Sequence, residues 1–180
     1  MKILKIAPLL LLLLATSCDK QEPEVPTPPN KQEVIQNKIF LTPEKFANEV
    51  FKAIKNNDLP KFSKLFPTKQ VFLDTLKQST IPEPELQKAK EGMDKKLKKR
   101  FKSFQESLVK IREKAKKDGV MWEKTIFGGV ECEIKEKHQV KTSDIYLLVT
   151  FQGINYKVKL DDCMKTTKGW LMFDDPSWRG

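Results

Sequence analysis

The chain has 180 residues, with 34 lysines and arginines against 24 acidic residues, a formal net charge of +10 and a single histidine. That length suits one domain with a substantial apolar core plus a short accessory segment. The one histidine and three cysteines have no zinc-ligand spacing, and the seven glycines form neither a Walker loop nor a dinucleotide-binding loop. The sequence therefore excludes the common zinc and nucleotide motifs, whereas its positive charge favours anionic partners.

The start of the chain has the layout of an export signal. Lys2 and Lys5 precede an apolar stretch, Ile6–Leu14, that contains six consecutive leucines, and small residues follow at 15–17. A positive start, a short apolar stretch and small residues before a cleavage point are typical of a secretory signal peptide. The apolar stretch is too short to span a bilayer, which takes about 20 residues. We therefore predict that residues 1–17 are a signal peptide.

Cys18 follows the small residues directly, and this arrangement resembles the lipobox of bacterial lipoproteins. The resemblance implies that the Cys18 thiol is diacylated, that the chain is cut before it, and that the new amino group is acylated, with palmitate as an expected acyl group. It also implies a lipid-anchored protein of the outer membrane. The charged segment Asp19–Glu22 resembles export signals of some Gram-negative surface lipoproteins, and orientation toward the periplasm is an equal alternative to the cell surface.

The segment after the signal peptide is predicted to be an anchor and a tether. Removal of 17 residues leaves 163 of the 180, and loss of Lys2 and Lys5 lowers the formal charge from +10 to +8. Residues 18–38 contain four prolines among polar and charged residues, without an apolar period, so they cannot bury enough surface to fold. Prolines favour extended backbone, so about 20 residues would reach about 60 Å. Residues 39–180 are then expected to form a single domain.

The first part of that domain has helical periodicity. The sequence Thr42-Pro43-Glu44 indicates a helix start, with a hydroxyl cap, proline at the first position and an acid in the first turn. Apolar residues at helical spacing follow between positions 46 and 54. The segment Asn56-Asn57-Asp58 is expected to end this helix and cap the next, and Thr68 is expected to cap a third short helix.

A long helix is predicted from Glu85 to Lys117, where Asp118-Gly119 ends it. We expect its apolar stripe to pack on the sheet that follows. The stripe has spacings of three and four: Leu86, Ala89, Met93, Leu97, Phe101, Phe104, Leu108, Ile111 and Ala115. Lysines crowd the other faces, and the 13 basic and four acidic residues between positions 86 and 117 give this segment a net charge of +9.

The densest basic stretch of that helix is a candidate for binding an anionic surface. It consists of Lys95, Lys96, Lys98, Lys99, Arg100 and Lys102. In an anchored protein the partner would be anionic lipid or lipopolysaccharide, at about 1 kcal/mol per basic residue near the surface. Nucleic acid is disfavoured, because an exported protein rarely meets it and no aromatic residue on that face is free to stack bases. A solvated helix without a partner is the alternative, and the sequence indicates no particular protein partner.

After Gly119 the apolar period changes from helical to alternating. Strands are predicted at residues 121–127, 130–134, 145–151, 156–160 and 170–173. The most apolar of them, 145–151, is expected at the centre, and residues 176–180 are expected to be a tail. Helices first and an antiparallel meander second predict an α+β fold, with the long basic helix among those packed on a curved sheet.

Two parts of this domain resemble a known family. The sequence FANEVFKAIKNNDLPKFSKLF is similar to the opening helices of small bacterial lipoproteins with the nuclear-transport-factor-2-like, or SnoaL-like, fold, and YKVKL with KGWLMFD is similar to their last hairpin. The resemblance covers residues 41–174. The family includes enzymes and binding modules. We therefore expect a membrane-anchored binding or structural module at the cell envelope, with a small-pocket enzyme on a SnoaL-like scaffold as the alternative.

With Cys18 lipidated, two cysteines are left in an exported chain. Cys132 and Cys163 are therefore a candidate disulfide. The alternative is two small buried thiols on neighbouring strands.

The other residues with potential chemistry favour structural roles. His138 lies in a polar stretch and is expected to be a solvated loop residue. The adjacent acids Asp161-Asp162 and Asp174-Asp175 would point to opposite faces of a strand, so turn-flanking, solvated positions are expected for them. Trp122, Trp170 and Trp178 are expected in the core or at the sheet edge. On a curved sheet, Trp122 or Trp170 would line the concave side. No catalytic residue, metal ligand or cofactor is predicted, and the sequence leans away from an enzyme.

Overall fold

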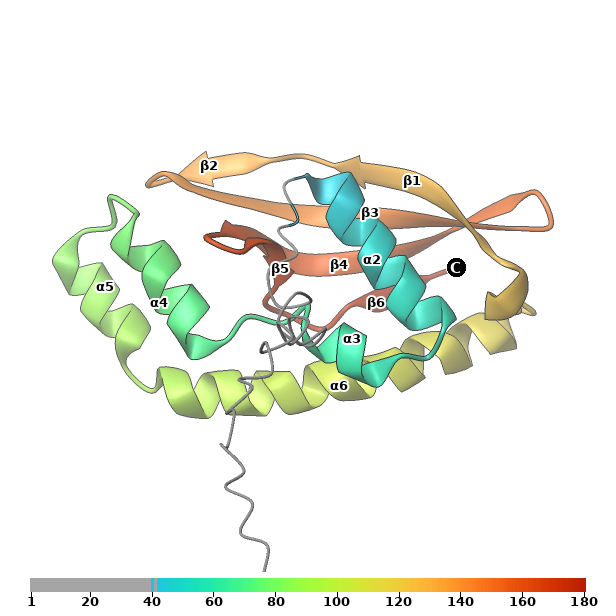
Figure 1. Ribbon diagram of the computed structural model, residues 1–180, viewed down its shortest axis with the longest axis horizontal. Helices are drawn as coiled ribbons and strands as arrows, with labels where there is room; N and C mark the ends of the chain where they lie inside the picture. Colours follow the sequence, from blue (N-terminus) through green and yellow to red (C-terminus); the bar gives the residue numbers. More distant parts are fainter. Residues whose placement is uncertain (1–39, 41) are drawn as a thin grey trace, which may run out of the picture.

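The helices come first in the chain and the sheet second, which confirms the predicted α+β fold (Figure 1). The computed structural model describes residue 40 and residues 42–180. The predicted signal peptide, Cys18 and the tether lie outside these residues. The helices are α2 (Pro43–Lys55), α3 (Leu59–Ser63), α4 (Lys69–Lys77), α5 (Glu83–Lys90) and α6 (Met93–Lys117). A 3-10 turn, η1 (Trp122–Lys124), leads to β1 (Ile126–Cys132), β2 (Lys135–Lys137), β3 (Val140–Phe151), β4 (Ile154–Thr166), β5 (Gly169–Met172) and β6 (Ser177–Arg179).

Side-chain caps begin the first three of these helices, as predicted. The Thr42 hydroxyl accepts a hydrogen bond from the Lys45 amide at 3.2 Å, and Pro43 occupies the first turn of α2. The Asp58 carboxylate accepts one from the Lys61 amide at 3.0 Å, and this bond lowers the pKa of Asp58. The Thr68 hydroxyl caps α4 in the same way. Each cap satisfies an amide that the helix itself leaves unpaired.

The predicted continuous helix from Glu85 to Lys117 is wrong, because the segment forms two helices. Glu91 leaves the helical conformation with ψ 125°, and Gly92 adopts φ 65° between α5 and α6. Glycine adopts this left-handed conformation without the steric cost that other residues meet. No residue of α5 is buried, so α5 has no buried apolar anchor that would hold it in line with α6.

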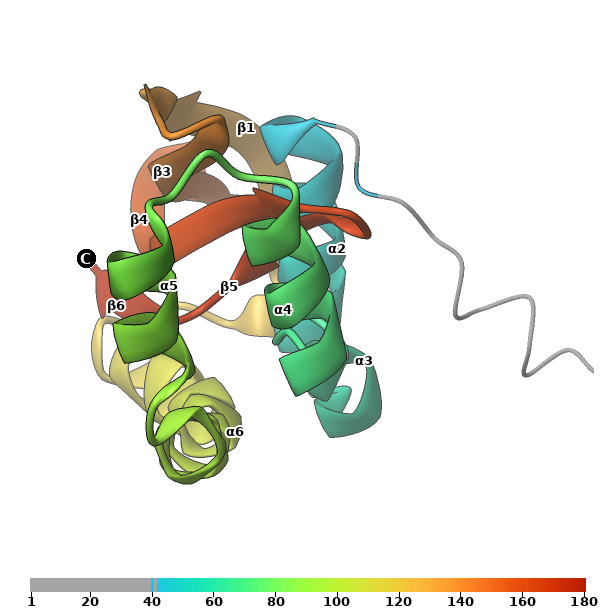
Figure 2. The ribbon, with the colours of Figure 1, turned by 90° about the vertical axis from the view of Figure 1, so that its left-hand side faces the viewer.

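The sheet has β3 and β4 at its centre, which confirms the predicted position of residues 145–151. Its strand order is β1-β3-β4-β5, with β2 also paired to β3 and β6 to β4. All these pairings are antiparallel. Figure 1 shows α2 lying across the sheet and α6 running lengthwise along the domain, and Figure 2 shows α6 end-on.

The start of the sheet differs from the prediction. Residues 121–127 are not one strand, because η1 occupies their middle and β1 begins only at Ile126. The two glycines do not end β1 either; they form a bulge opposite β3. Gly129 has φ 113°, and a β-carbon on Gly128 would lie 2.9 Å from the Thr150 hydroxyl. The glycines therefore allow a close, twisted approach of β1 to β3.

The end of the chain also differs from the prediction. Residues 176–180, expected to be a tail, contain β6, which pairs with β4 and places Trp178 opposite Val158. Trp178 is buried, stacks on Tyr156 with ring centroids 5.4 Å apart, and donates its indole N–H to Asp118 at 2.6 Å. A third contact, from Trp178 to Trp122, joins the end of the chain to η1. These contacts explain why the segment is ordered as a strand.

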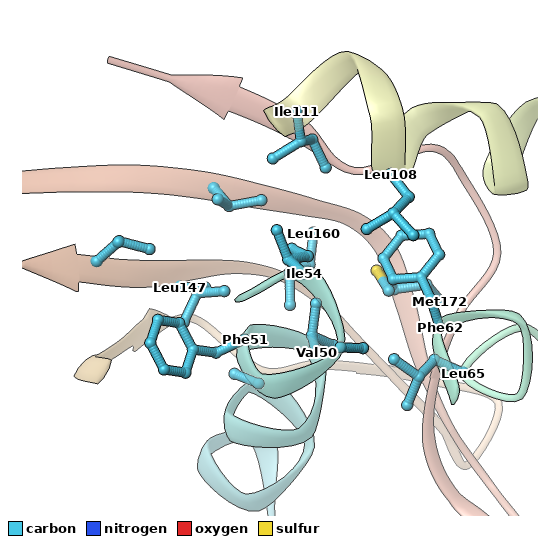
Figure 3. Close-up of a cluster of buried hydrophobic side chains, with 14 of the residues drawn as sticks. Val50, Phe51, Ile54, Phe62, Leu65, Leu108, Ile111, Leu147, Leu160 and Met172 are labelled. Carbon is cyan, nitrogen blue, oxygen red and sulfur yellow. The ribbon is translucent and has the colours of Figure 1, made fainter. Parts of the chain in front are cut away.

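One contiguous apolar core joins the helices to the sheet (Figure 3). Phe62 of α3 stacks on Phe104 of α6 with centroids 4.5 Å apart, and Phe66 lies 5.2 Å from Phe104. The fully buried members include Phe46, Val50, Ile54, Leu108, Ile111, Ile145, Leu147, Leu160 and Met172. All lie within the described residues, so we expect the chain from Phe40 onward to fold as a unit.

Most of the predicted stripe is buried within α6. Met93, Phe104, Leu108, Ile111 and Ala115 are buried, whereas Leu97 and Phe101 are only partly buried. The helix packs against α2, α3 and α4 and, among the strands, mainly against β6. Trp122 and Trp170 belong to the same core. The sheet face that would line a pocket in the enzyme alternative is packed against α2.

Replacing Phe104 with alanine should destabilise the domain by about 3–5 kcal/mol, because the change removes a fully buried ring and leaves a cavity. Phe101→Ala should cost clearly less, because Phe101 keeps part of its surface in solvent. Urea unfolding followed by circular dichroism would measure both free energies of unfolding. Equal costs for the two variants would contradict this packing.

Candidate functional site

The predicted basic stretch lies on the open side of the first turns of α6. We call Lys95, Lys96, Lys98, Lys99 and Lys102 the lysine cluster; all five are exposed. Within the described residues none of them has an ion-pair partner within 4.0 Å. The nearby acid Asp94 pairs with Lys69 of α4 at 2.7 Å instead. The cluster therefore presents its positive charges to solvent.

Arg100, predicted as part of the same binding surface, makes contacts within the fold. Its guanidinium donates a hydrogen bond to the Phe173 carbonyl at 3.0 Å and lies 3.7 Å from the Asp174 carboxylate. One turn further along, the Ser103 hydroxyl bonds to the Asp175 carboxylate. These contacts fasten α6 to the connection between β5 and β6. Arg100 thus helps to hold α6 in place at the edge of the lysine cluster.

Helix stability does not explain the lysine cluster. Lys95, Lys96, Lys98 and Lys99 lie in the first two turns of α6, close to the helix end that carries partial positive charge. Each cluster lysine also lies three or four residues from another, and like charges at that spacing destabilise a helix by about 0.2–0.5 kcal/mol per pair. Both effects lower the stability of α6. Attraction of a negatively charged partner would account for the arrangement.

The predicted disulfide between Cys132 and Cys163 is not formed, and both cysteines are free. Cys132 pairs with Ile145 on one side of β3, and Cys163 pairs with Ser143 on the other side. Because strands lie about 4.8 Å apart, two strands flanking a third are about 10 Å apart, which exceeds the reach of a disulfide of about 7 Å. Burial raises the pKa of the Cys163 thiol, so this thiol stays protonated and unreactive.

The adjacent acids are also engaged in structural contacts. Asp161 bonds to the Lys159 ammonium, which lies 3.2 Å from Asp144 as well. The bond to Asp161, reinforced by the one to Asp144, raises the pKa of Lys159. Asp162 is exposed at a positive φ of 45° in β4, where β3 and β4 shift register. In the described part of the chain, no group of three histidine, cysteine or acidic residues could hold a metal ion.

His138 lies at the β2–β3 turn, with φ 52°. Its contact is a backbone one, since its carbonyl accepts a hydrogen bond from the Thr80 amide at 3.1 Å. The bond ties the loop before α5 to the sheet. His138 therefore lies at a structural turn and lines neither of the two depressions described next.

Two surface depressions lie away from the lysine cluster. One, of about 400 Å³, surrounds the register shift of β3 and is mostly polar, with Cys132, Ser143, Asp144 and Asp162 in its lining. The Ser143 hydroxyl donates to the Asp144 carbonyl, and no histidine is present to activate it or Cys132. The other, of about 390 Å³, lies between α6 and η1.

No family model, curated protein or solved structure matches this chain. Among the described helices, none combines the length and the apolar character that crossing a membrane takes.

Replacing Lys95 and Lys96 together with glutamate should raise the free energy of unfolding by about 0.5–2 kcal/mol, because each acid would lie near the positive end of α6. The matched change of Lys114 and Lys117, at the opposite end of the helix, should lower it. Urea titrations of the two double variants against wild type would test this. An unchanged or lower stability after the first change would show that the cluster carries no cost for the helix.

Proposed function

We propose that this protein is a lipid-anchored envelope protein whose lysine cluster binds anionic headgroups on the membrane surface. The observation that carries the proposal is the set of five exposed lysines without ion-pair partners in the described region, at a position where they oppose helix stability. The attachment through Cys18 and the outer-membrane address rest on the lipobox resemblance. No cofactor takes part in such a function.

The chemistry of the cluster fits phosphate-bearing lipid. Each basic residue near an anionic surface contributes about 1 kcal/mol, so several together give useful affinity. The anchor would hold the domain close to the bilayer, and a tether with a reach of about 60 Å would make the second contact effectively intramolecular. Phospholipid and lipopolysaccharide share this phosphate chemistry. No aromatic residue lies among Lys95, Lys96, Lys98, Lys99 and Lys102 to stack nucleic-acid bases other than the partly buried Phe101.

The resemblance to SnoaL-like proteins rests on the order of elements in residues 41–174 and is part of this proposal. Its enzymatic alternative has no comparable support. The sheet face that would line a pocket packs against α2, and the polar depression lacks a nucleophile with an adjacent base, which covalent catalysis needs. A binding module is therefore the better supported function.

Cys18→Ala protein should lose the fatty-acid mass and leave the membrane fraction, because the thioether attachment needs the cysteine sulfur. Mass spectrometry of the purified protein and fractionation of cells would show both effects. Cleavage at the same place together with continued membrane attachment would contradict the anchor.

The lysine cluster can be tested with the lipid-free chain of residues 19–180. It should sediment with phosphatidylglycerol-containing vesicles but not with phosphatidylcholine vesicles, and salt of about 0.5 M should release most of it, because screening then acts within a few Å. Changing Lys95, Lys96, Lys98 and Lys99 to glutamate should weaken binding more than about tenfold. Vesicles containing lipopolysaccharide would show which phosphate source binds more tightly.

A matched control separates a local cluster from net charge. The change of Lys114, Lys117, Lys135 and Lys137 to glutamate alters the formal charge by the same amount, and all four residues are exposed. Equal losses in the two quadruple variants would indicate nonspecific attraction. Salt-insensitive binding to both kinds of vesicle would rule out the electrostatic proposal.

A further inference from the structure

The side of α6 that carries the lysine cluster continues into an apolar patch. Val109 follows Lys102 by seven residues, which is close to two helical turns and places both on the same side of the helix, about 10 Å apart along its axis. Val109 is 53% exposed, although valine in a helix of a soluble domain usually faces the core. A flat surface resting on Lys98 and Lys102 would therefore also contact Val109.

Beside Val109 lies the depression of about 390 Å³ between α6 and η1. Figure 1 shows the C-terminal half of α6 next to η1. Met121, 43% exposed, also lines the depression, together with the buried side chains of Val120 and Trp122. We call these four residues, Val109, Val120, Met121 and Trp122, the apolar patch. Of the six exposed large apolar side chains in the described chain, two belong to it.

The polar groups around the patch leave it open to an apolar occupant. Arg112 is held by hydrogen bonds to the Ile54 carbonyl at 2.6 Å and to Glu123 at 3.1 Å. Glu113 and Lys116, which also line the depression, balance each other in charge. The indole nitrogen of Trp122, a residue only 3% exposed, has no hydrogen-bond partner in the described part of the protein. The indole N–H is itself buried, so the accessible apolar part of the lining consists of the exposed side chains of Val109 and Met121.

We propose that Val109 and Met121, the exposed members of the apolar patch, enter the boundary between headgroups and acyl chains of the same anionic bilayer that the lysine cluster binds. This inference rests on the proposed function, and it adds a second, salt-resistant contact. Exposed apolar side chains beside basic residues suit the membrane interface, where headgroup phosphates lie next to hydrocarbon. The lysine cluster supplies the attraction to the surface, and Val109 and Met121 supply the contact that persists when salt screens the charges.

The test uses the lipid-free chain of residues 19–180 and vesicles of phosphatidylethanolamine and phosphatidylglycerol. The double variant Val109→Ser, Met121→Ser should lose about tenfold in affinity at low salt, and it should lose the binding that remains at high salt. The matched control is Ile134→Ser, Ile154→Ser, which removes two side chains of similar exposure from the connection between β1 and β2 and from the start of β4. The control should bind as wild type does.

The outcomes separate this inference from the proposed function. If the patch variant binds as wild type at both salt concentrations while the quadruple lysine variant loses binding, the apolar contact is wrong and the electrostatic function stands. If only the patch variant loses binding, the electrostatic function is wrong. If both the patch variant and its control lose binding equally, the effect is not specific to the patch and the inference is overturned.

A gain-of-function variant keeps the test independent of any loss of folding. Val109→Trp enlarges the apolar side chain at an exposed position, so it should bind the anionic vesicles more tightly than wild type. Its added tryptophan emission should shift to shorter wavelength on these vesicles and be quenched by brominated acyl chains. Neither effect should occur with phosphatidylcholine vesicles. A Val109→Trp chain that binds anionic vesicles without shift or quenching would overturn the inference.

Discussion

The burial of one side of α6 is the constraint on which the rest of the structure depends. Phe104 stacks on Phe62 and contacts Phe66, and Leu108 and Ile111 continue the buried side into the core shared with the sheet. A helix with one apolar side has a single favourable orientation. Once that side is buried, the five lysines of the cluster and Val109 must face outward. The burial of one side of α6 therefore determines which of its residues are exposed.

The exposed side of α6 is organised differently in its two halves. The N-terminal half carries lysines where the helix end is already positive, and the C-terminal half carries lysines in its last turn, at 114, 116 and 117, where they favour the helix. The second arrangement stabilises the fold, whereas the first costs stability. The lysines lower helix stability only at the N-terminal end of α6. We therefore place the partner at the lysine cluster and not along the whole helix.

Local signals allowed much of the fold to be predicted, and long-range contacts account for the errors. The caps at Thr42 and Asp58 and the central strand depend on neighbours in sequence. The break at Gly92 depends on whether tertiary contacts hold α5 in line, and the absence of a Cys132–Cys163 bond depends on β3 lying between their strands. The bond from Arg100 to Phe173 spans 73 residues. Such partners leave no pattern in the local sequence.

The arginines and the cluster lysines of α6 have different roles, which follow from the geometry of their side chains. Both arginines of the helix make directed bonds to backbone carbonyls, Arg100 to Phe173 and Arg112 to Ile54 and Lys55. The planar guanidinium suits such fixed partners. The cluster lysines are compact charges on flexible stems and hold no fixed partner in the described structure. A fluid layer of headgroups offers no fixed geometry, so mobile point charges match it better than guanidinium groups do. The arginines thus set the position of α6, and that position determines what its lysines can touch.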